Sequence, residues 1–111
     1  MVNQWVTLSD KKLIKEVFQK GIRVGSKALS ICFKKNSLTQ TRYLFCSDRT
    51  TKTAVYRNKV KRILRALVRE KDLVHPSGYD IAILGGKEFV NKDFSERKKI
   101  LFTLLKNVTI K

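Results

Sequence analysis

The stretch AVYRNKVKRILRALVRE, residues 54–70, predicts an amphipathic helix with two unlike sides. At about 100° per residue, its apolar side chains fall on an arc of about 100°: Tyr56, Val60, Ile63, Leu64 and Leu67. A second arc of about 140° carries cations and one amide: Arg57, Asn58, Lys61, Arg62, Arg65 and Arg69. We expect a helix from about Ala54 to Lys71 whose apolar side packs on a sheet.

Acidic residues are missing from the whole interval between Asp48 and Glu70. The same interval holds the cations Arg49, Lys52, Arg57, Lys59, Lys61, Arg62, Arg65 and Arg69. Like charges four residues apart each cost a few tenths of a kcal/mol in an isolated helix, whereas phosphates would neutralise the row and release counterions. A charge run is usually a solvated surface. The missing acids, the amide of Asn58 and the net charge of +16 favour a polyanionic partner instead.

The amino-acid composition limits the class of binding partner and the cellular compartment that we expect for this protein. The balance of 25 Lys and Arg against 9 Asp and Glu indicates nucleic acid first and an anionic membrane surface second. No apolar run approaches the roughly 20 residues of a membrane span, and the N-terminal sequence lacks the uninterrupted apolar segment of a signal peptide. We therefore expect a cytoplasmic protein with no membrane partner.

Residues that could carry chemistry are few and scattered. Cys32 and Cys46 have no CxxC spacing, so zinc is not expected and both are predicted to be reduced, buried thiols. His75 beside Pro76 is interpreted as a solvated loop residue. The acids are dispersed along the chain, which argues against a two-metal nuclease site, and Asp80 is expected to pair its strand. We expect no catalytic residue and no metal ligand in this chain.

The hydropathy pattern predicts one domain over residues 1–111. Its order is helix, strand, strand, helix, strand, helix, an α+β sandwich with a small sheet. The expected helices cover about 10–20, 54–71 and 92–106, and the expected strands cover 27–34, 42–47 and 79–84. The first two strands are expected to be antiparallel. Tyr43 and Phe45 on the second strand are expected in the core.

The run Arg57-Asn58-Lys59-Val60-Lys61-Arg62-Ile63-Leu64-Arg65 resembles the RNxxKRxxR signature of the protein subunit of bacterial ribonuclease P. The stretches 14–24 and 78–83 resemble the first helix and a later strand of the same family, so the resemblance spans about residues 8–105. The chain departs from the family pattern in four places. Arg49-Thr50-Thr51-Lys52 stands for Lys-Lys-x-Gly, Ala66 for a Glu, Ile14 for a Phe, and Cys32 for an aromatic residue.

The resemblance implies a mixed-sheet sandwich with a left-handed crossover and an RNA-binding role. The RNA subunit would hydrolyse the phosphodiester with Mg²⁺ that it mainly binds itself, and this chain would be the accessory subunit of that endoribonuclease. The implied partners are the ribonuclease P RNA and precursor tRNA, and no DNA. The residues implied to bind RNA are Arg57, Asn58, Lys61, Arg62, Arg65, Arg69, Arg49 and Lys52. Those implied to line a cleft for the 5′ leader are Phe18, Ile14 and Cys32. The loss of two aromatic residues should weaken base stacking there.

Composition leaves two other functions open. One is a structural RNA-binding protein, such as a small ribosomal protein. The other is a self-sufficient metal-dependent nuclease, which would cleave RNA without any RNA subunit. A role at a membrane surface fits least, because the basic helix directs its apolar arc toward a core.

Overall fold

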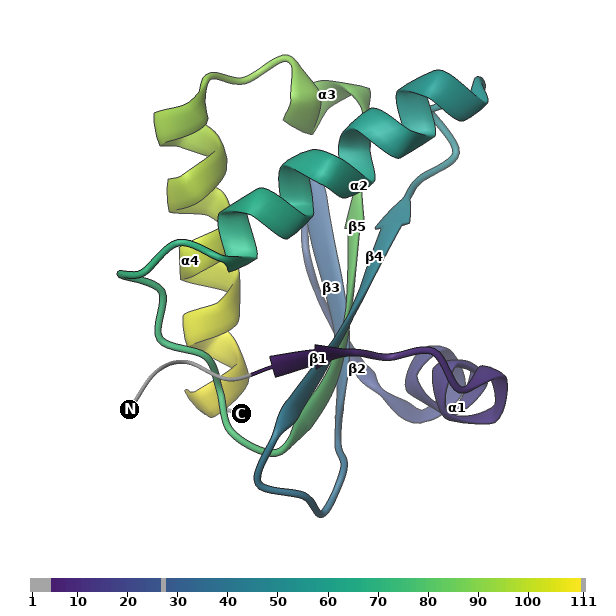
Figure 1. The fold of residues 1–111 in the computed structure, drawn as a ribbon, viewed down its shortest axis with the longest axis vertical. Helices are drawn as coiled ribbons and strands as arrows, with labels where there is room; N and C mark the ends of the chain where they lie inside the picture. Colours follow the sequence, from purple (N-terminus) through teal and green to yellow (C-terminus); the bar gives the residue numbers. More distant parts are fainter. Residues whose placement is uncertain (1–4, 27, 111) are drawn as a thin grey trace.

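The computed structural model describes residues 5–26 and 28–110, and in these residues one mixed β-sheet carries helices on both faces (Figure 1). The strands lie in the order β1-β4-β5-β3-β2 across the sheet. Their bounds are β1 Trp5–Thr7, β2 Ile22–Gly25, β3 Leu29–Lys35, β4 Thr41–Ser47 and β5 Tyr79–Gly85. The helices are α1 Lys11–Lys20, α2 Ala54–Val68, α3 Lys87–Val90 and α4 Phe94–Ile110.

The strand β5 joins the two halves of the sheet. It pairs in parallel with β4 on one side and antiparallel with β3 on the other. β1 then extends the sheet in parallel with β4, and β2 extends it antiparallel to β3. The predicted α+β class with a mixed sheet is confirmed. The chain passes from β4 through α2 to the parallel strand β5, and this is the crossover for which the resemblance implies a left hand.

The expected elements are present with shifted ends. α2 ends at Val68 and not at Lys71, while α4 covers 94–110 and not 92–106. The two strands expected to be antiparallel, β3 and β4, do run in opposite directions, but they are not neighbours because β5 lies between them. Three short elements go beyond the prediction, namely β1, β2 and α3.

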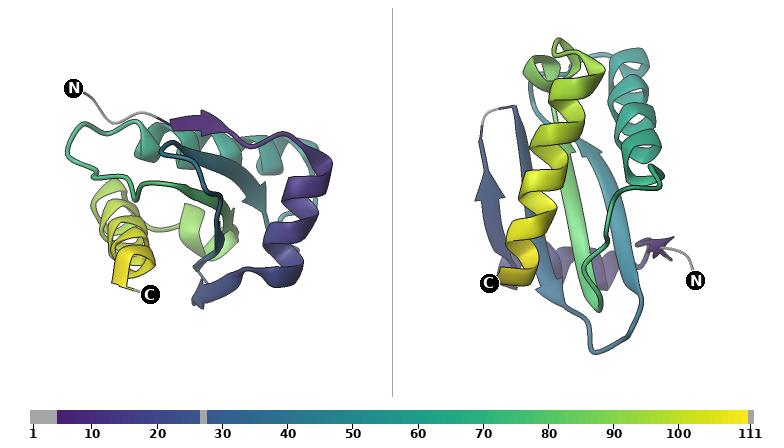
Figure 2. Two further views of the ribbon diagram at one scale, coloured as in Figure 1. Left: turned by 90° about the horizontal axis from the view of Figure 1, so that it is seen from below. Right: turned by 90° about the vertical axis from the view of Figure 1, so that its left-hand side faces the viewer.

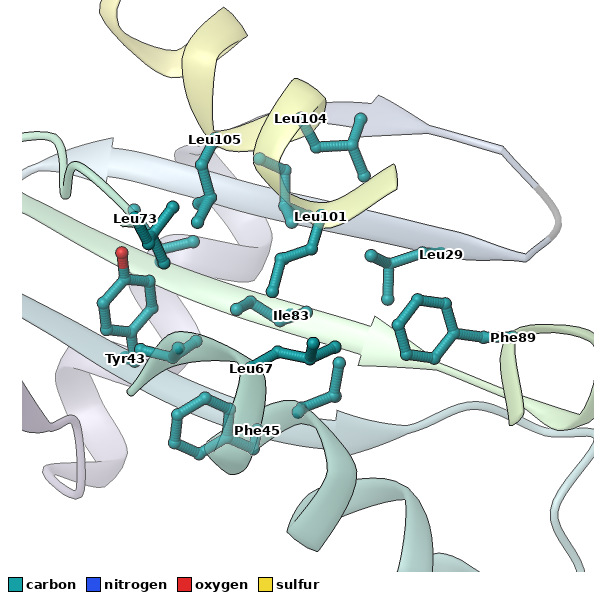
Figure 3. Packing of buried hydrophobic residues seen from close by; sticks show 14 of the residues in the cluster. Leu29, Tyr43, Phe45, Leu67, Leu73, Ile83, Phe89, Leu101, Leu104 and Leu105 are labelled. Atoms are coloured by element: carbon teal, nitrogen blue, oxygen red, sulfur yellow. The ribbon is translucent and has the colours of Figure 1, made fainter. Parts of the chain in front are cut away.

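The main core lies between the sheet and the helices α2, α3 and α4 (Figures 2 and 3). The strands contribute alternate residues, including Ile31, Phe33, Tyr43, Phe45 and Ile83, as period-two alternation requires. α2 contributes Val60, Leu64 and Leu67, and α4 contributes Leu101 and Leu105, each at most 1% exposed. The prediction that the apolar arc of the basic helix faces a core is therefore confirmed, as is the core position of Tyr43 and Phe45.

Among the described residues, α1 is the helix that covers the opposite face of the sheet. A smaller cluster of Leu8, Val17, Cys32 and Ala82 forms beneath that helix. Asp10 caps the start of α1, because its carboxylate accepts the amides of Lys12 and Leu13 at 2.9 and 3.2 Å. Because α1 is only ten residues long, part of this face stays uncovered.

The isolated polar residues have structural partners. Both cysteines are free, but Cys46 is half-buried and not buried as expected. The interpretation of His75 as a solvated loop residue is wrong, because its Nδ1 lies 2.8 Å from the Tyr43 hydroxyl and burial lowers its pKa. Asp80 links its strand β5 to the neighbouring strand β4, as expected, because its carboxylate accepts from Nε and Nη2 of Arg42 at 2.7 and 2.9 Å. No helix of the described chain is long and apolar enough to cross a membrane.

Candidate nucleic-acid interface

The outer side of α2 carries a row of residues that we call the basic ridge: Arg57, Asn58, Lys61, Arg62, Arg65 and Arg69. All of them are exposed except Lys61, which is half-buried. The helix starts at Thr53, whose hydroxyl accepts the amide of Tyr56 at 3.2 Å. Because Val60, Leu64 and Leu67 anchor the other side in the core, the ridge is held facing away from the sheet.

The ridge cations have no acidic partner within the described chain. The ion pairs found there are Lys34–Glu16, Arg42–Asp80, Lys98–Glu70 and Lys98–Asp72, and all of them lie outside α2. One ridge residue is nevertheless held in place, because the guanidinium of Arg65 lies 5.6 Å from the centre of the Phe45 ring. The ridge is thus a surface of uncompensated positive charge on a rigid support.

The loop before α2 is tied to the start of α3 by hydrogen bonds through Thr50. Oδ1 of Asp48 accepts the amide and the hydroxyl of Thr50 at 2.8 and 2.5 Å. The Thr50 hydroxyl in turn accepts the amide of Lys87 at 3.0 Å, at the start of α3. Thr51 is 3% exposed and donates to the Asp48 carbonyl. These bonds fix the loop and leave the side chains of its two cations, Arg49 and Lys52, exposed.

A cleft of about 970 Å³ opens on the sheet face that α1 leaves uncovered. Its lining comes from α1, β2, the ends of β4 and β5, the loop before α2 and the first turn of α2. In Figure 1, α1 and the start of α2 both lie on the right of the sheet. The residues predicted to bind RNA or leader that line it are Phe18, Arg49, Lys52 and Arg57. Phe18 is 41% exposed, so its ring is accessible from the cleft that it lines. The cleft therefore joins one aromatic surface to several cations.

Two of the predicted cleft residues do not line it. Cys32 is 3% exposed, its thiol donates to the Val17 carbonyl at 3.3 Å, and burial raises its pKa. Ile14 is half-buried and packs against the same cluster beneath α1. The expectation that these two side chains face a ligand in the cleft is corrected: Cys32 is buried beneath α1, and Ile14 packs from α1 against the same cluster, so both support the helix that presents Phe18.

The cation Arg23 is a cleft residue that the predicted site residues do not include. Arg23 on β2 lines the cleft together with Phe18, and its Nη2 donates to the Ser30 hydroxyl at 3.4 Å. Arg23 lies in the stretch 14–24 that resembles the family, but the segment Gly21-Ile22-Arg23-Val24-Gly25 is too short to predict as a strand and the resemblance implied no role for this residue. The other ridge residues do not line the cleft, so Arg57 alone belongs to both surfaces.

The described side chains do not fit a metal site. No group of three or more His, Cys, Asp or Glu residues in the described chain is arranged to hold a metal ion. Asp48 is the acid in the cleft wall, and its Oδ1 is occupied by Thr50. Hard cations such as Mg²⁺ need several oxygen ligands, whereas this surface offers guanidinium and ammonium groups.

Comparison with known proteins agrees with this geometry. The family model described as Ribonuclease P matches residues 3–109. The ribonuclease P protein component of Syntrophomonas wolfei is 27% identical, over 96% of this chain and 89% of its own length. That of Thermotoga petrophila is 32% identical, over 83% and 82%. The solved ribonuclease P protein of Thermotoga maritima superimposes with a TM-score of 0.79 at 28% identity, covering 91% of this chain and 96% of that one. That of Staphylococcus aureus shares the fold, with a TM-score of 0.76 at 18% identity and 95% coverage of each chain.

Proposed function

The chain belongs to the ribonuclease P protein family, and on that premise we propose that it binds the catalytic RNA through the basic ridge and the 5′ leader of precursor tRNA in the cleft. The family assignment supports the protein component of ribonuclease P over the alternative of a ribosomal RNA-binding protein. We place the complex in the cytoplasm on the basis of the family assignment.

The observation that carries the proposal is the ridge of uncompensated cations on a buried support. Arginine presents a planar fork that suits two phosphate oxygens, and four of the ridge residues are arginines. Asn58 among them can donate to a phosphate or a ribose hydroxyl. Since no carboxylate of the described chain competes for these groups, binding a folded RNA releases counterions without first breaking an ion pair.

The cleft suits a single strand better than a duplex. Proteins hold single-stranded RNA by combining a positive groove with an aromatic side chain on which bases stack. The cleft supplies both, with Arg49, Lys52 and Arg57 in its wall and Phe18 exposed within it. Because Arg57 also belongs to the ridge, a leader in the cleft would pass directly beside the catalytic RNA.

The hydrolysis itself is assigned to the RNA subunit. The described side chains offer no metal site, so Mg²⁺ would be held by the RNA and would supply the activated water there. The protein would contribute by neutralising phosphates that otherwise repel one another and by holding the leader in a fixed position. Both effects lower the concentration of Mg²⁺ that the RNA needs.

Reconstitution tests this assignment. Cleavage of a precursor tRNA by a bacterial ribonuclease P RNA is measured at a magnesium concentration at which the RNA alone is nearly inactive. Addition of this chain should restore cleavage. Arg62→Glu on the ridge should abolish the effect, whereas Lys99→Glu, an exposed cation on α4, should preserve it. The proposal fails if the chain has no effect, if both variants behave alike, or if the chain cleaves RNA by itself.

A further inference from the structure

Arg23 stands where the uncovered face of the sheet meets the end of α1. In the register of β2 and β3, Arg23 lies opposite Cys32, so both side chains belong to the face that carries α1. Cys32 is buried beneath the helix, while Arg23 is exposed on the edge strand and lines the cleft. The guanidinium is close enough to lower the pKa of the Cys32 thiol, although burial raises it by more. Arg23 therefore places an exposed positive charge on the same face of the sheet as the buried Cys32.

The Arg23 guanidinium is positioned without being neutralised. Its Nη2 donates to the Ser30 hydroxyl at 3.4 Å, which uses one of the five N–H donors of the group. No ion pair joins it to a carboxylate of the described residues. The acid that shares the cleft wall, Asp48, is bonded through Oδ1 to Thr50. The remaining donors of Arg23 are thus available to a ligand.

Arg23 and Phe18 line the cleft from α1 and β2, and the other cations line it from the loop before α2 and from α2 itself. Phe18 comes from the last turns of α1, and Arg23 follows on β2 three residues after the helix ends. Arg49, Lys52 and Arg57 come from the loop and the start of α2. A single strand that enters the cleft meets a ring for a base and a fork for the adjoining phosphate.

We propose that Arg23 binds a backbone phosphate of the single-stranded leader beside a base stacked on Phe18. This proposal rests on the proposed function, and it adds a substrate contact outside the basic ridge. Arg23 would act on the substrate and not on the assembly with the catalytic RNA, because it lies on the edge strand β2 and does not belong to the ridge on α2. A guanidinium plane can also stack on a base, so this position tolerates any leader sequence.

The test compares substrates with and without a leader. The holoenzyme is reconstituted with wild-type chain, Arg23→Gln, or Lys15→Gln as a control that removes an exposed cation from α1 outside the cleft. Dissociation constants are measured for precursor tRNA and for the mature tRNA. Arg23→Gln should weaken precursor tRNA binding about three- to tenfold and leave mature tRNA unchanged. The slope of log affinity against log salt for precursor tRNA should fall by about 0.7. Lys15→Gln should match the wild type.

Each other outcome has a distinct meaning. Equal losses for both tRNAs would show that Arg23 only braces β2 against β3 through Ser30, and would overturn the proposal. No loss for either tRNA would overturn it as well. If the wild-type chain fails to activate the catalytic RNA at all, the proposed function falls. Binding of a free single-stranded RNA by the isolated chain and by Arg23→Gln then decides the Arg23 proposal alone, and equal affinities would reject it.

Discussion

The guanidinium of Arg65 lies 5.6 Å from the centre of the Phe45 ring, so a cation of the basic ridge rests directly on a side chain of the main core. Phe45 is 6% exposed and sits on β4 among the aromatic residues Trp5 and Tyr43. The contact fixes one ridge cation relative to the sheet, and hence relative to the cleft on its other face. RNA binding and core packing are therefore linked at this point.

Arg65→Gln should reduce both properties, but by different amounts. An exposed cation–π contact is worth about 0.5–1 kcal/mol, so the free energy of unfolding should fall within that range. The affinity for the catalytic RNA should fall further, because a phosphate contact is lost as well. Urea denaturation and RNA titration measure the two effects. Phe45→Leu is the matched variant, and a smaller effect on RNA affinity than on stability is expected from it. The reverse order in either variant would contradict the assignment.

The number of phosphate contacts that the basic ridge makes can be measured from the salt dependence of RNA binding. Each lost phosphate contact should reduce the slope of log affinity against log salt by about one. Arg62→Gln should therefore flatten the slope for the catalytic RNA by that amount, while Lys99→Gln on α4 should leave it unchanged. Titrations of the RNA at several salt concentrations measure both. An unchanged slope for Arg62→Gln would remove this residue from the RNA-binding surface.

Thr50 connects the loop before α2 to α3. Thr50→Val keeps the shape of the side chain but removes its bonds to Asp48 and to the amide of Lys87. We expect the Lys87 amide to exchange faster with solvent and the leader to bind about twofold more weakly, since Arg49 and Lys52 lose their fixed position. Hydrogen exchange and precursor tRNA binding test this. Thr39→Val, on an exposed turn, should change neither, and an equally protected Lys87 amide in Thr50→Val would contradict the expectation.

The sequence predicts those features of the structure that are determined by a pattern of neighbouring residues. The amphipathic period of α2 assigns both the buried Leu64 and the exposed Arg62 from residues within the helix itself. The cleft is different, because it joins Phe18, Arg23 and Arg57 from elements that only the sheet brings together. The burial of Cys32 agrees with its apolar surroundings in the sequence, but its exclusion from the cleft depends on where α1 packs on the sheet. The insertion of β5 between β3 and β4 is a long-range pairing that no local signal encodes.

The buried pair of Arg42 and Asp80 holds three strands in register. Arg42 on β4 donates twice to Asp80 on β5, and Asn36 after β3 donates to the same carboxylate at 3.0 Å. Asp80→Ala leaves the Arg42 charge without a partner, and we expect it to lower the free energy of unfolding by about 3 kcal/mol. Asp72→Ala breaks the exposed pair with Lys98 and should cost less than about 1 kcal/mol. Urea denaturation compares them, and similar losses would show that burial does not strengthen the first pair.

His75 should make the protein less stable in mild acid. Burial lowers its pKa from the ordinary value of 6.5, so the folded chain favours the neutral ring, whose Nδ1 can accept from the Tyr43 hydroxyl. The unfolded chain binds the proton more readily than the folded chain. The contribution of His75 to the free energy of unfolding is therefore fully present above pH 6.5, and it is lost as the pH drops through 6.5 toward the folded-state pKa. His75 is the one histidine of the sequence, and carboxylates titrate mainly below about pH 5, so the effect can be assigned to this residue. Urea midpoints at about pH 7.5 and about pH 5.5 should differ for the wild type and agree more closely for His75→Gln. An equal decrease in both proteins would show that His75 does not titrate differently in the folded state.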